Sequence, residues 1–192
     1  MRIRSAALVT LVLTGCGSGS LDLSRSAPAT FHLEPGGYEI GRVVEVADGD
    51  TMEVLITGRV EGPGAGVARP GERYDVRFIG MDTPESVKPG TPIECYGREA
   101  SAAARALLGG RTVRLVDDVE QKDSYDRLLR YVYVGDEMAN ARLVLNGYAS
   151  AYTHPPNVRH TDLFVSLQRR ARRSEAGLWS PTACPDPPDG PG

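Results

Sequence analysis

The chain has 192 residues, of which 41% are hydrophobic and only 6% are aromatic. This composition suits one compact domain with tails and leaves little room for a second core. The formal net charge is −3 at pH 7. This charge excludes the broadly basic surface of a tight duplex binder, so any binding of nucleic acid must be local.

The first fifteen residues have the layout of an export signal. Arg2 and Arg4 precede an apolar stretch, 6–13, that is too short to span a bilayer as a mature helix. The string Leu13-Thr14-Gly15-Cys16 resembles a bacterial lipobox, which implies cleavage before Cys16 and acylation of that cysteine. We therefore expect an exported lipoprotein, anchored to the bacterial cell membrane on its extracytoplasmic side. The alternative is an ordinary signal with an incidental cysteine.

Residues 16–36 are rich in Gly, Ser, Ala and Pro, so a flexible tether is expected there. Residues 181–192 are rich in Pro and Gly, and we expect a disordered tail. The folded domain is therefore predicted to span residues 37–180.

Two strands are predicted at 38–46 and 52–56. The turn Ala47-Asp48-Gly49-Asp50 joins them, because Asp-Gly is a strong hairpin signal. Asp50 is thereby placed beside a tight turn. Residues 58–71 are rich in glycine and include two prolines, which predicts a long, mobile loop before the third strand.

The third strand is predicted at 74–78 from its alternating pattern. Tyr74, Val76 and Phe78 face one side of the strand, and Asp75 and Arg77 face the other. Arg77 is therefore expected to point away from the core. Beyond this strand, residues 86–96 are predicted to form a loop, and 99–108 an alanine-rich helix.

Two further strands are predicted at 111–116 and 128–134 from their β-branched and aromatic content. Arg127 then lies at the mouth of the fifth strand. A short helix is predicted at 137–146 and an amphipathic one at 161–174. Five strands in a small barrel with three helices describe an OB-fold, in the α+β class.

Cys95 and Cys184 are the cysteines that remain if Cys16 is lipidated. Disulfides persist in the compartment of an exported protein, which favours a bridge between the two. Such a bridge would pin the C-terminal end back onto the domain. The alternative is two buried free thiols.

The predicted chemistry rests on acidic residues and two arginines. Asp82 and Glu85 follow the third strand as two carboxylates three residues apart, and Asp50 lies in the upstream acidic turn. Together with Arg77 and Arg127, they supply a cation-binding carboxylate pair, a candidate general base and two phosphate-binding groups. This set is the one needed for metal-assisted cleavage of a phosphodiester, so the pattern predicts a nuclease.

Several segments resemble, in order, the thermonuclease (staphylococcal nuclease) family. The four main ones are Val46-Ala47-Asp48-Gly49-Asp50-Thr51, Val76-Arg77-Phe78-Ile79-Gly80-Met81-Asp82-Thr83-Pro84-Glu85, Tyr96-Gly97-Arg98-Glu99-Ala100 and Asp123-Ser124-Tyr125-Asp126-Arg127. Asn146-Gly147-Tyr148-Ala149 and Gly177-Leu178-Trp179 extend the match. Several strings in the right order at compatible spacings are strong evidence, whereas one alone is weak.

The resemblance implies an OB-fold, dependence on Ca²⁺, attack on DNA and RNA, and products that end in 3′-phosphates. It makes Asp50 and Asp82 the carboxylate ligands of Ca²⁺, with the backbone carbonyl of Thr83 as a third ligand. Glu85 matches the glutamate that orients or deprotonates the attacking water. We expect the substrate to be single-stranded or frayed DNA and RNA, and the protein to be a monomer.

By the same resemblance, Arg77 and Arg127 hold the phosphate as negative charge builds in the transition state. Tyr125 and Tyr152 match aromatic positions that contact the bound nucleotide; the alternative for them is half-buried packing. The chain departs from the family pattern at Asp126, where glycine is usual. An acid there is expected to pair with the neighbouring arginine or to repel phosphate.

A second departure is His154, which aligns with a tyrosine of the family and receives no catalytic role. Two other functional classes compete with the nuclease hypothesis. One is a non-catalytic nucleic-acid-binding module on a lipid anchor, which keeps the fold without the chemistry. The other is a lipid-tethered structural protein that uses Ca²⁺ only for stability. The joint presence of the ligands, the base and both arginines favours the nuclease.

Overall fold

The computed structural model describes residues 36–86, 90 and 92–184. The predicted signal peptide, Cys16, the tether up to residue 35 and the tail from residue 185 lie outside these residues. None of the helices in the described part of the chain is both long and apolar enough to cross a membrane.

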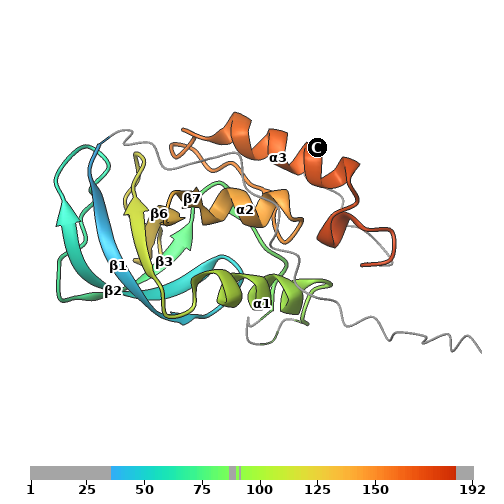
Figure 1. The fold of residues 1–192 in the computed structure, drawn as a ribbon, viewed down its shortest axis with the longest axis horizontal. Helices are drawn as coiled ribbons and strands as arrows, with labels where there is room; N and C mark the ends of the chain where they lie inside the picture. Colours follow the sequence, from blue (N-terminus) through green and yellow to red (C-terminus); the bar gives the residue numbers. More distant parts are fainter. Residues whose placement is uncertain (1–35, 87–89, 91, 185–192) are drawn as a thin grey trace, which may run out of the picture.

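Five strands form a closed barrel, as the OB-fold prediction requires (Figure 1). They are β1 (Tyr38–Val46), β2 (Thr51–Val60), β3 (Arg73–Phe78), β5 (Thr112–Val116) and β6 (Leu128–Val134). β1 lies between β2 and β5, β2 pairs with β3, and β5 pairs with β6, all antiparallel. The parallel pairing of β3 with β6 closes the barrel and aligns Arg77 with Leu129. The predicted fold is therefore confirmed, and β1 and β6 have the predicted bounds.

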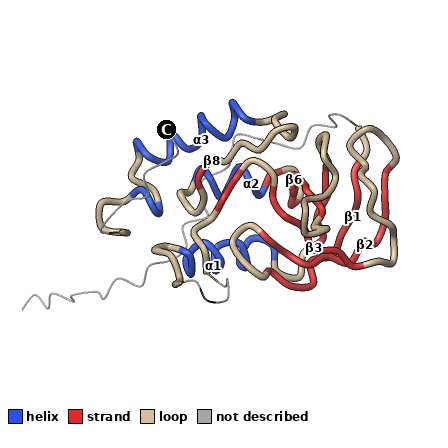
Figure 2. Tube along the Cα trace, turned by 180° about the vertical axis from the view of Figure 1, so that it is seen from behind, coloured by secondary structure: helices blue, strands red, loops and turns tan. Residues whose placement is uncertain are grey.

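Three α-helices cover one side of the barrel: α1 (Gly97–Leu108), α2 (Ala139–Leu145) and α3 (Thr161–Arg173). A short 3-10 helix, η1 (Gly177–Trp179), follows α3. In both views α2 lies between α1 and α3 (Figures 1 and 2), and it contacts each of them. The ring of Phe164 on α3 packs against Gly80, where an added Cβ would lie 2.2 Å from a ring carbon. This close packing positions the chain just before Asp82.

Three short strands were not predicted from the sequence. β4 (Met81–Asp82) pairs with β8 (Ser150–Ala151), and β7 (Glu137–Met138) pairs with the end of β6. The second helix therefore starts at Ala139 rather than at Glu137, because pairing with β6 holds residues 137 and 138 extended. β4 and β8 pair with each other from distant parts of the chain, whereas β7 pairs across the tight turn that follows β6; each has only two residues, too few for a local pattern to predict.

The loop expected at 58–71 is found, but it begins later than predicted. β2 continues to Val60, and the rest of the segment is held against the barrel by hydrogen bonds. The amide of Ala68 donates to Glu39 Oε1 at 2.8 Å, and the amide of Val67 donates to Gln121 Oε1 at 3.2 Å. These side-chain acceptors lie 29 and 54 residues away, so the glycine-rich composition predicts the loop but not these contacts.

A fully buried ion pair, Glu39 and Arg130, joins β1 to β6. Arg130 Nε donates to Glu39 Oε2 at 2.7 Å, and Nη2 donates to Oε1 at 3.1 Å. Nη1 donates to the carbonyls of Gln121 and Leu129. The pair thus satisfies its hydrogen-bonding groups inside the barrel, as buried charges must.

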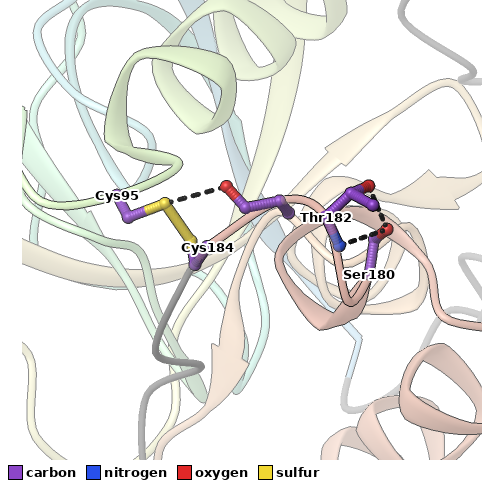
Figure 3. The surroundings of a disulfide bond; sticks show 5 residues. Cys95, Ser180, Thr182 and Cys184 are labelled. Atoms are coloured by element: carbon purple, nitrogen blue, oxygen red, sulfur yellow. Dashed lines mark hydrogen bonds between the residues drawn. A yellow bond between two sulfur atoms is a disulfide. The ribbon is translucent and has the colours of Figure 1, made fainter.

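Cys95 and Cys184 form a disulfide with their Cα atoms 5.9 Å apart (Figure 3). The bond joins the segment just before α1 to the segment just after η1, 89 residues further along the chain. The prediction of a bridge, rather than two free thiols, holds in this structure.

Candidate active site

Asp50 is placed by the turn between β1 and β2, where the amides of Ala47 and Asp48 donate to the carbonyl of Thr51. Its side chain is buried, with only 4% of the residue exposed. The amide and the hydroxyl of Thr83 both donate to Asp50 Oδ2 at 3.1 Å. These two bonds bring the first acidic turn against the second, although 33 residues separate them.

Arg77 bridges the two predicted metal ligands. It lies on β3 opposite the buried side chains of Val76 and Phe78, and its guanidinium pairs with the carboxylates of Asp50 and Asp82. Burial alone would lower the pKa of Arg77, but these two carboxylates outweigh it and raise the pKa above its usual value. Two carboxylates from separate turns therefore converge on one cationic group.

Desolvation raises the pKa of the Asp82 carboxylate, while the charge of Arg77 acts in the opposite direction. Thr83, the next residue, is buried through its bonds to Asp50. Among the residues that the structure describes, no three carboxylate, imidazole or thiolate groups gather closely enough to hold a metal. A cation held by the Asp50 and Asp82 carboxylates would therefore need further oxygens from the backbone, water or substrate.

Glu85 follows three residues after Asp82 and is half-buried. Its amide donates to Glu94 Oε2 at 2.9 Å, and its carbonyl accepts from the amide of Glu94 at 2.9 Å. Its side chain also interacts with the carboxylate of Asp48. Glu85 therefore has both of its backbone groups held and its carboxyl near the first acidic turn.

Asp48 is the centre of a hydrogen-bond network that sequence reasoning missed. Its Oδ1 accepts from the Gly49 amide at 2.7 Å, from the Ser86 hydroxyl at 2.6 Å and from the Ser101 hydroxyl at 2.7 Å. Burial would raise the pKa of Asp48, but these donors outweigh it and hold the pKa below its usual value. Asp48 thus ties the first acidic turn to α1 and to the residue after Glu85.

Arg127 is held by Asp123, four residues before it. Arg127 Nε donates to Asp123 Oδ2 at 2.7 Å, and the Arg127 amide donates to Oδ1 at 3.0 Å. The guanidinium lies over the ring of Tyr125, 5.4 Å from its centroid. The sequence motif that contains Asp123 assigns it no role. In the structure, Asp123 orients the second arginine.

Asp126 pairs with Lys122, whose Nζ donates to Asp126 Oδ1 at 2.8 Å. The expectation that it pairs with Arg127 is therefore wrong, because Asp123 already occupies that guanidinium. Asp126 has φ +67°, a left-handed conformation that glycine adopts without steric cost. This geometry explains why glycine is usual at the position.

Replacing Asp126 with glycine is expected to raise the free energy of unfolding by up to about 1 kcal/mol, because the left-handed backbone is relieved. It also frees Lys122 beside the site, so KM for a polyanionic substrate should fall while kcat is unchanged. Chemical denaturation and steady-state cleavage measure the two effects.

The matched variant Asp126→Ala removes the same carboxylate but keeps Cβ, so it should lower KM without the gain in stability. A glycine variant less stable than the alanine variant would contradict this explanation.

A cleft of about 440 Å³ joins the two arginines. Of the predicted site residues, its walls include Arg77, Arg127, Tyr125 and Tyr152. Asp50, Asp82, Thr83 and Glu85 are not among the lining residues, and they connect to the cleft through Arg77. The structure thus gathers the arginines and tyrosines around one cavity, with the carboxylates at its Arg77 end.

The two predicted nucleotide-contacting tyrosines are accessible. Tyr125 is 80% exposed, which does not fit the half-buried packing alternative, whereas Tyr152 is 46% exposed and about half-buried. The imidazole of His154 stacks against Tyr152, with ring centroids 6.2 Å apart and planes 13° apart. His154 also lines the cleft, which makes it an aromatic wall residue in the place where the family pattern has tyrosine.

The comparisons with known proteins agree with this fold. The family model described as "Staphylococcal nuclease homologue" matches residues 75–181. The thermonuclease of Staphylococcus hyicus is 37% identical over 139 residues, which cover 72% of this chain and 75% of that protein. The thermonuclease of Staphylococcus intermedius is 39% identical over 137 residues, covering 71% of this chain and 74% of that protein. Endonuclease YncB of Bacillus subtilis is 31% identical over 135 residues, covering 69% and 58% respectively.

A closed barrel of five strands with three helices defines an OB-fold protein. The chain belongs to the staphylococcal nuclease family. By that membership it is a nuclease hydrolase, which confirms the class of enzyme that the acidic turns and the arginines predict.

Proposed function

We propose that this chain is a Ca²⁺-dependent phosphodiesterase that hydrolyses DNA and RNA to products with 3′-phosphate ends. The observation that carries the proposal is the convergence of Asp50 and Asp82 on Arg77, with Glu85 three residues further along the same turn. Arg127, the residue just before β6, lines the same cleft as Arg77. This arrangement would set the proposed ligands and base at the Arg77 end of a cleft that both anion-binding arginines line.

The donor set fits calcium. Asp50 and Asp82 contribute hard carboxylate oxygens from two turns that meet at one guanidinium, and the backbone carbonyl of Thr83 would add a third oxygen. Calcium takes six to eight oxygen ligands, so water and a substrate oxygen would complete the shell. When bound, the ion would supply Lewis-acid polarisation of the phosphoryl group.

Glu85 is assigned the proton transfer from the attacking water, because its carboxylate is anchored on the same turn as Asp82. Arg77 and Arg127 are assigned to the phosphate oxygens, because their planar forks donate two hydrogen bonds each and keep their charge at any working pH. Tyr125 and Tyr152 are exposed at the cleft, where they would stack on the bases of an unpaired strand. Stacking on unpaired bases would favour single-stranded or frayed substrate over intact duplex.

We also propose that the protein is exported and lipid-anchored through Cys16, and that it acts as a monomer. The support is the residue pattern at 1–16 and, for export, a disulfide between Cys95 and Cys184 of the kind that persists outside the cytoplasm. Residues 37–180 would be the nuclease domain. Mass spectrometry of the protein isolated from cell membranes would detect the acylated Cys16 directly.

The test of the metal site uses Asp82→Asn. Titration calorimetry with Ca²⁺ should show weaker binding than in the unmodified protein, and cleavage of single-stranded DNA and RNA in Ca²⁺ should fall by at least about tenfold. Added Ca²⁺ should raise Tm in the unmodified protein and have less effect in the variant.

The matched control is Asp75→Asn, which makes the same change on an exposed position of β3 and should leave binding and cleavage unchanged. Cleavage that continues undiminished in chelator would contradict calcium dependence. Calcium binding without any cleavage would make the non-catalytic nucleic-acid-binding module the better account.

A further inference from the structure

The backbone of Glu85 is held by the segment that carries the disulfide. The Glu85 amide donates to the side chain of Glu94, and the Glu94 amide donates back to the Glu85 carbonyl, both at 2.9 Å. Cys95, the next residue, is bonded to Cys184. Glu85, the proposed base, is therefore hydrogen-bonded twice to Glu94, and the neighbour of Glu94 is covalently cross-linked.

The same segment also packs closely against Glu85. A Cβ added at Gly97 would lie 2.6 Å from the Glu85 carbonyl oxygen, so α1 begins directly against this peptide group. The Gly97 amide donates to the Glu94 carbonyl at 3.0 Å, and the ring of Tyr96 stacks on Tyr148, with centroids 5.9 Å apart. Residues 94–97 thus form a fixed support for Glu85.

The cross-link joins this support to the C-terminal segment. Cys184 is buried, with 5% of the residue exposed, and the Sγ of Cys95 lies 3.1 Å from the carbonyl oxygen of Ala183 (Figure 3). The C-terminal segment is itself held to the domain, because the Leu178 amide donates to the Gly147 carbonyl at 2.8 Å. The bond therefore fixes residues 94–97 to a part of the chain that does not otherwise belong to the site.

We propose that Glu94 is a positioning residue for Glu85 and that the Cys95–Cys184 disulfide supports it, so that the bond sustains the rate of cleavage as well as the stability of the fold. This inference rests on the proposed function of Glu85. Fixing the amide and the carbonyl of Glu85 sets the direction of its Cα–Cβ bond, and hence where its carboxylate starts. The next residue, Ser86, is itself held by the hydrogen bond from its hydroxyl to Asp48.

The cross-link matters here because Glu94 is exposed. A hydrogen bond between an exposed carboxylate and an amide competes with water, so alone it would hold Glu85 only part of the time. The disulfide limits the positions open to the neighbouring residue and so keeps the carboxylate close to its partner. Loss of either element should loosen the base while the contacts of Arg77 and Arg127 stay in place. Because the charge of Glu94 also acts on Asp82, the variants of Glu94 are compared with each other as well as with the unmodified protein.

The test compares Glu94→Ala, Glu94→Gln and Cys95→Ser/Cys184→Ser with the unmodified full chain. Steady-state cleavage of a single-stranded oligonucleotide gives kcat and KM, and calorimetry gives the affinity for Ca²⁺. At saturating Ca²⁺, Glu94→Ala should lower kcat about tenfold with KM unchanged, since small misplacements of a catalytic group cost this much or more. Any change in calcium affinity comes from loss of the Glu94 charge near Asp82 and should be the same in the alanine and glutamine variants. Glu94→Gln keeps an oxygen acceptor and should restore most of kcat. The double serine variant should change kcat in the same direction, measured at a temperature where circular dichroism shows it folded.

Glu99→Ala is the control for charge, because Glu99 is an exposed carboxylate in the first turn of α1, and its kcat should equal that of the unmodified protein. Amide hydrogen exchange at Glu85 provides a readout that does not need activity, and exchange should be faster in Glu94→Ala and in the serine variant. Unchanged exchange at Glu85, or an equal loss of kcat in the alanine and glutamine variants, would overturn the proposal. An unmodified protein without cleavage in Ca²⁺ would instead refute the proposed function, while the exchange data would still decide the positioning claim.

Discussion

Glu85→Gln is expected to lower kcat by about 10²–10⁴-fold, the range that a positioned general base contributes. Glutamine has nearly the same shape as glutamate, so the turn that carries Asp82 should be unchanged, but its amide cannot accept a proton from water. The two hydrogen bonds with Glu94 run through the backbone of this residue, and the substitution leaves them in place. Steady-state cleavage of single-stranded DNA in saturating Ca²⁺ measures the effect.

The affinity for Ca²⁺ separates this effect from damage to the metal site. Calorimetry on Glu85→Gln should give calcium binding close to that of the unmodified protein, because the proposed ligands are Asp50, Asp82 and the Thr83 carbonyl. The matched control is Glu99→Gln, at an exposed position of α1, with no expected change in kcat. A kcat for Glu85→Gln within about twofold of the unmodified value would remove Glu85 from the mechanism.

Arg130→Met is expected to reduce the free energy of unfolding by about 3–5 kcal/mol, because it leaves the buried carboxylate of Glu39 without its partner. Both side chains are fully buried, so water cannot replace the lost hydrogen bonds. The backbone carbonyls of Gln121 and Leu129 lose donors as well. Urea denaturation followed by circular dichroism measures the change.

The exposed pair Arg73 and Glu53 is the control. Its atoms are 3.2 Å apart, and 61% of the arginine side chain is exposed, so Arg73→Met should cost no more than about 1 kcal/mol. The double variant Glu39→Met/Arg130→Met should lose less than the sum of the two single variants, since no unpaired charge stays buried. A loss below about 1 kcal/mol for Arg130→Met would show that the buried pair contributes little to stability.

The barrel was predictable because most of its strands bury one face. Along β3 the buried residues Val76 and Phe78 alternate with the less buried Asp75 and Arg77, and such alternation is visible without any partner strand. The short strands β4, β7 and β8 carry two residues each. A pair of residues is too short to show a period, so only the partner strand reveals them.

The site divides in the same way. The proposed ligands, the proposed base and the two arginines follow from motifs, because their residue types and spacings are local. The support around them does not, because Glu94 reaches Glu85 across a loop and Ser101 reaches Asp48 from α1. Asp126 is an intermediate case: its departure from glycine was visible in the sequence, but its partner Lys122 depended on the turn geometry.

The most direct test of the central claim is the chemistry of the product ends. The unmodified protein is incubated with a single-stranded oligonucleotide in Ca²⁺, and the fragments are analysed by mass spectrometry before and after treatment with a 3′-phosphatase. The account predicts fragments that carry 3′-phosphates and 5′-hydroxyls, formed in Ca²⁺ and absent in chelator. Fragments with 5′-phosphates, or an oligonucleotide left intact in Ca²⁺, would contradict it.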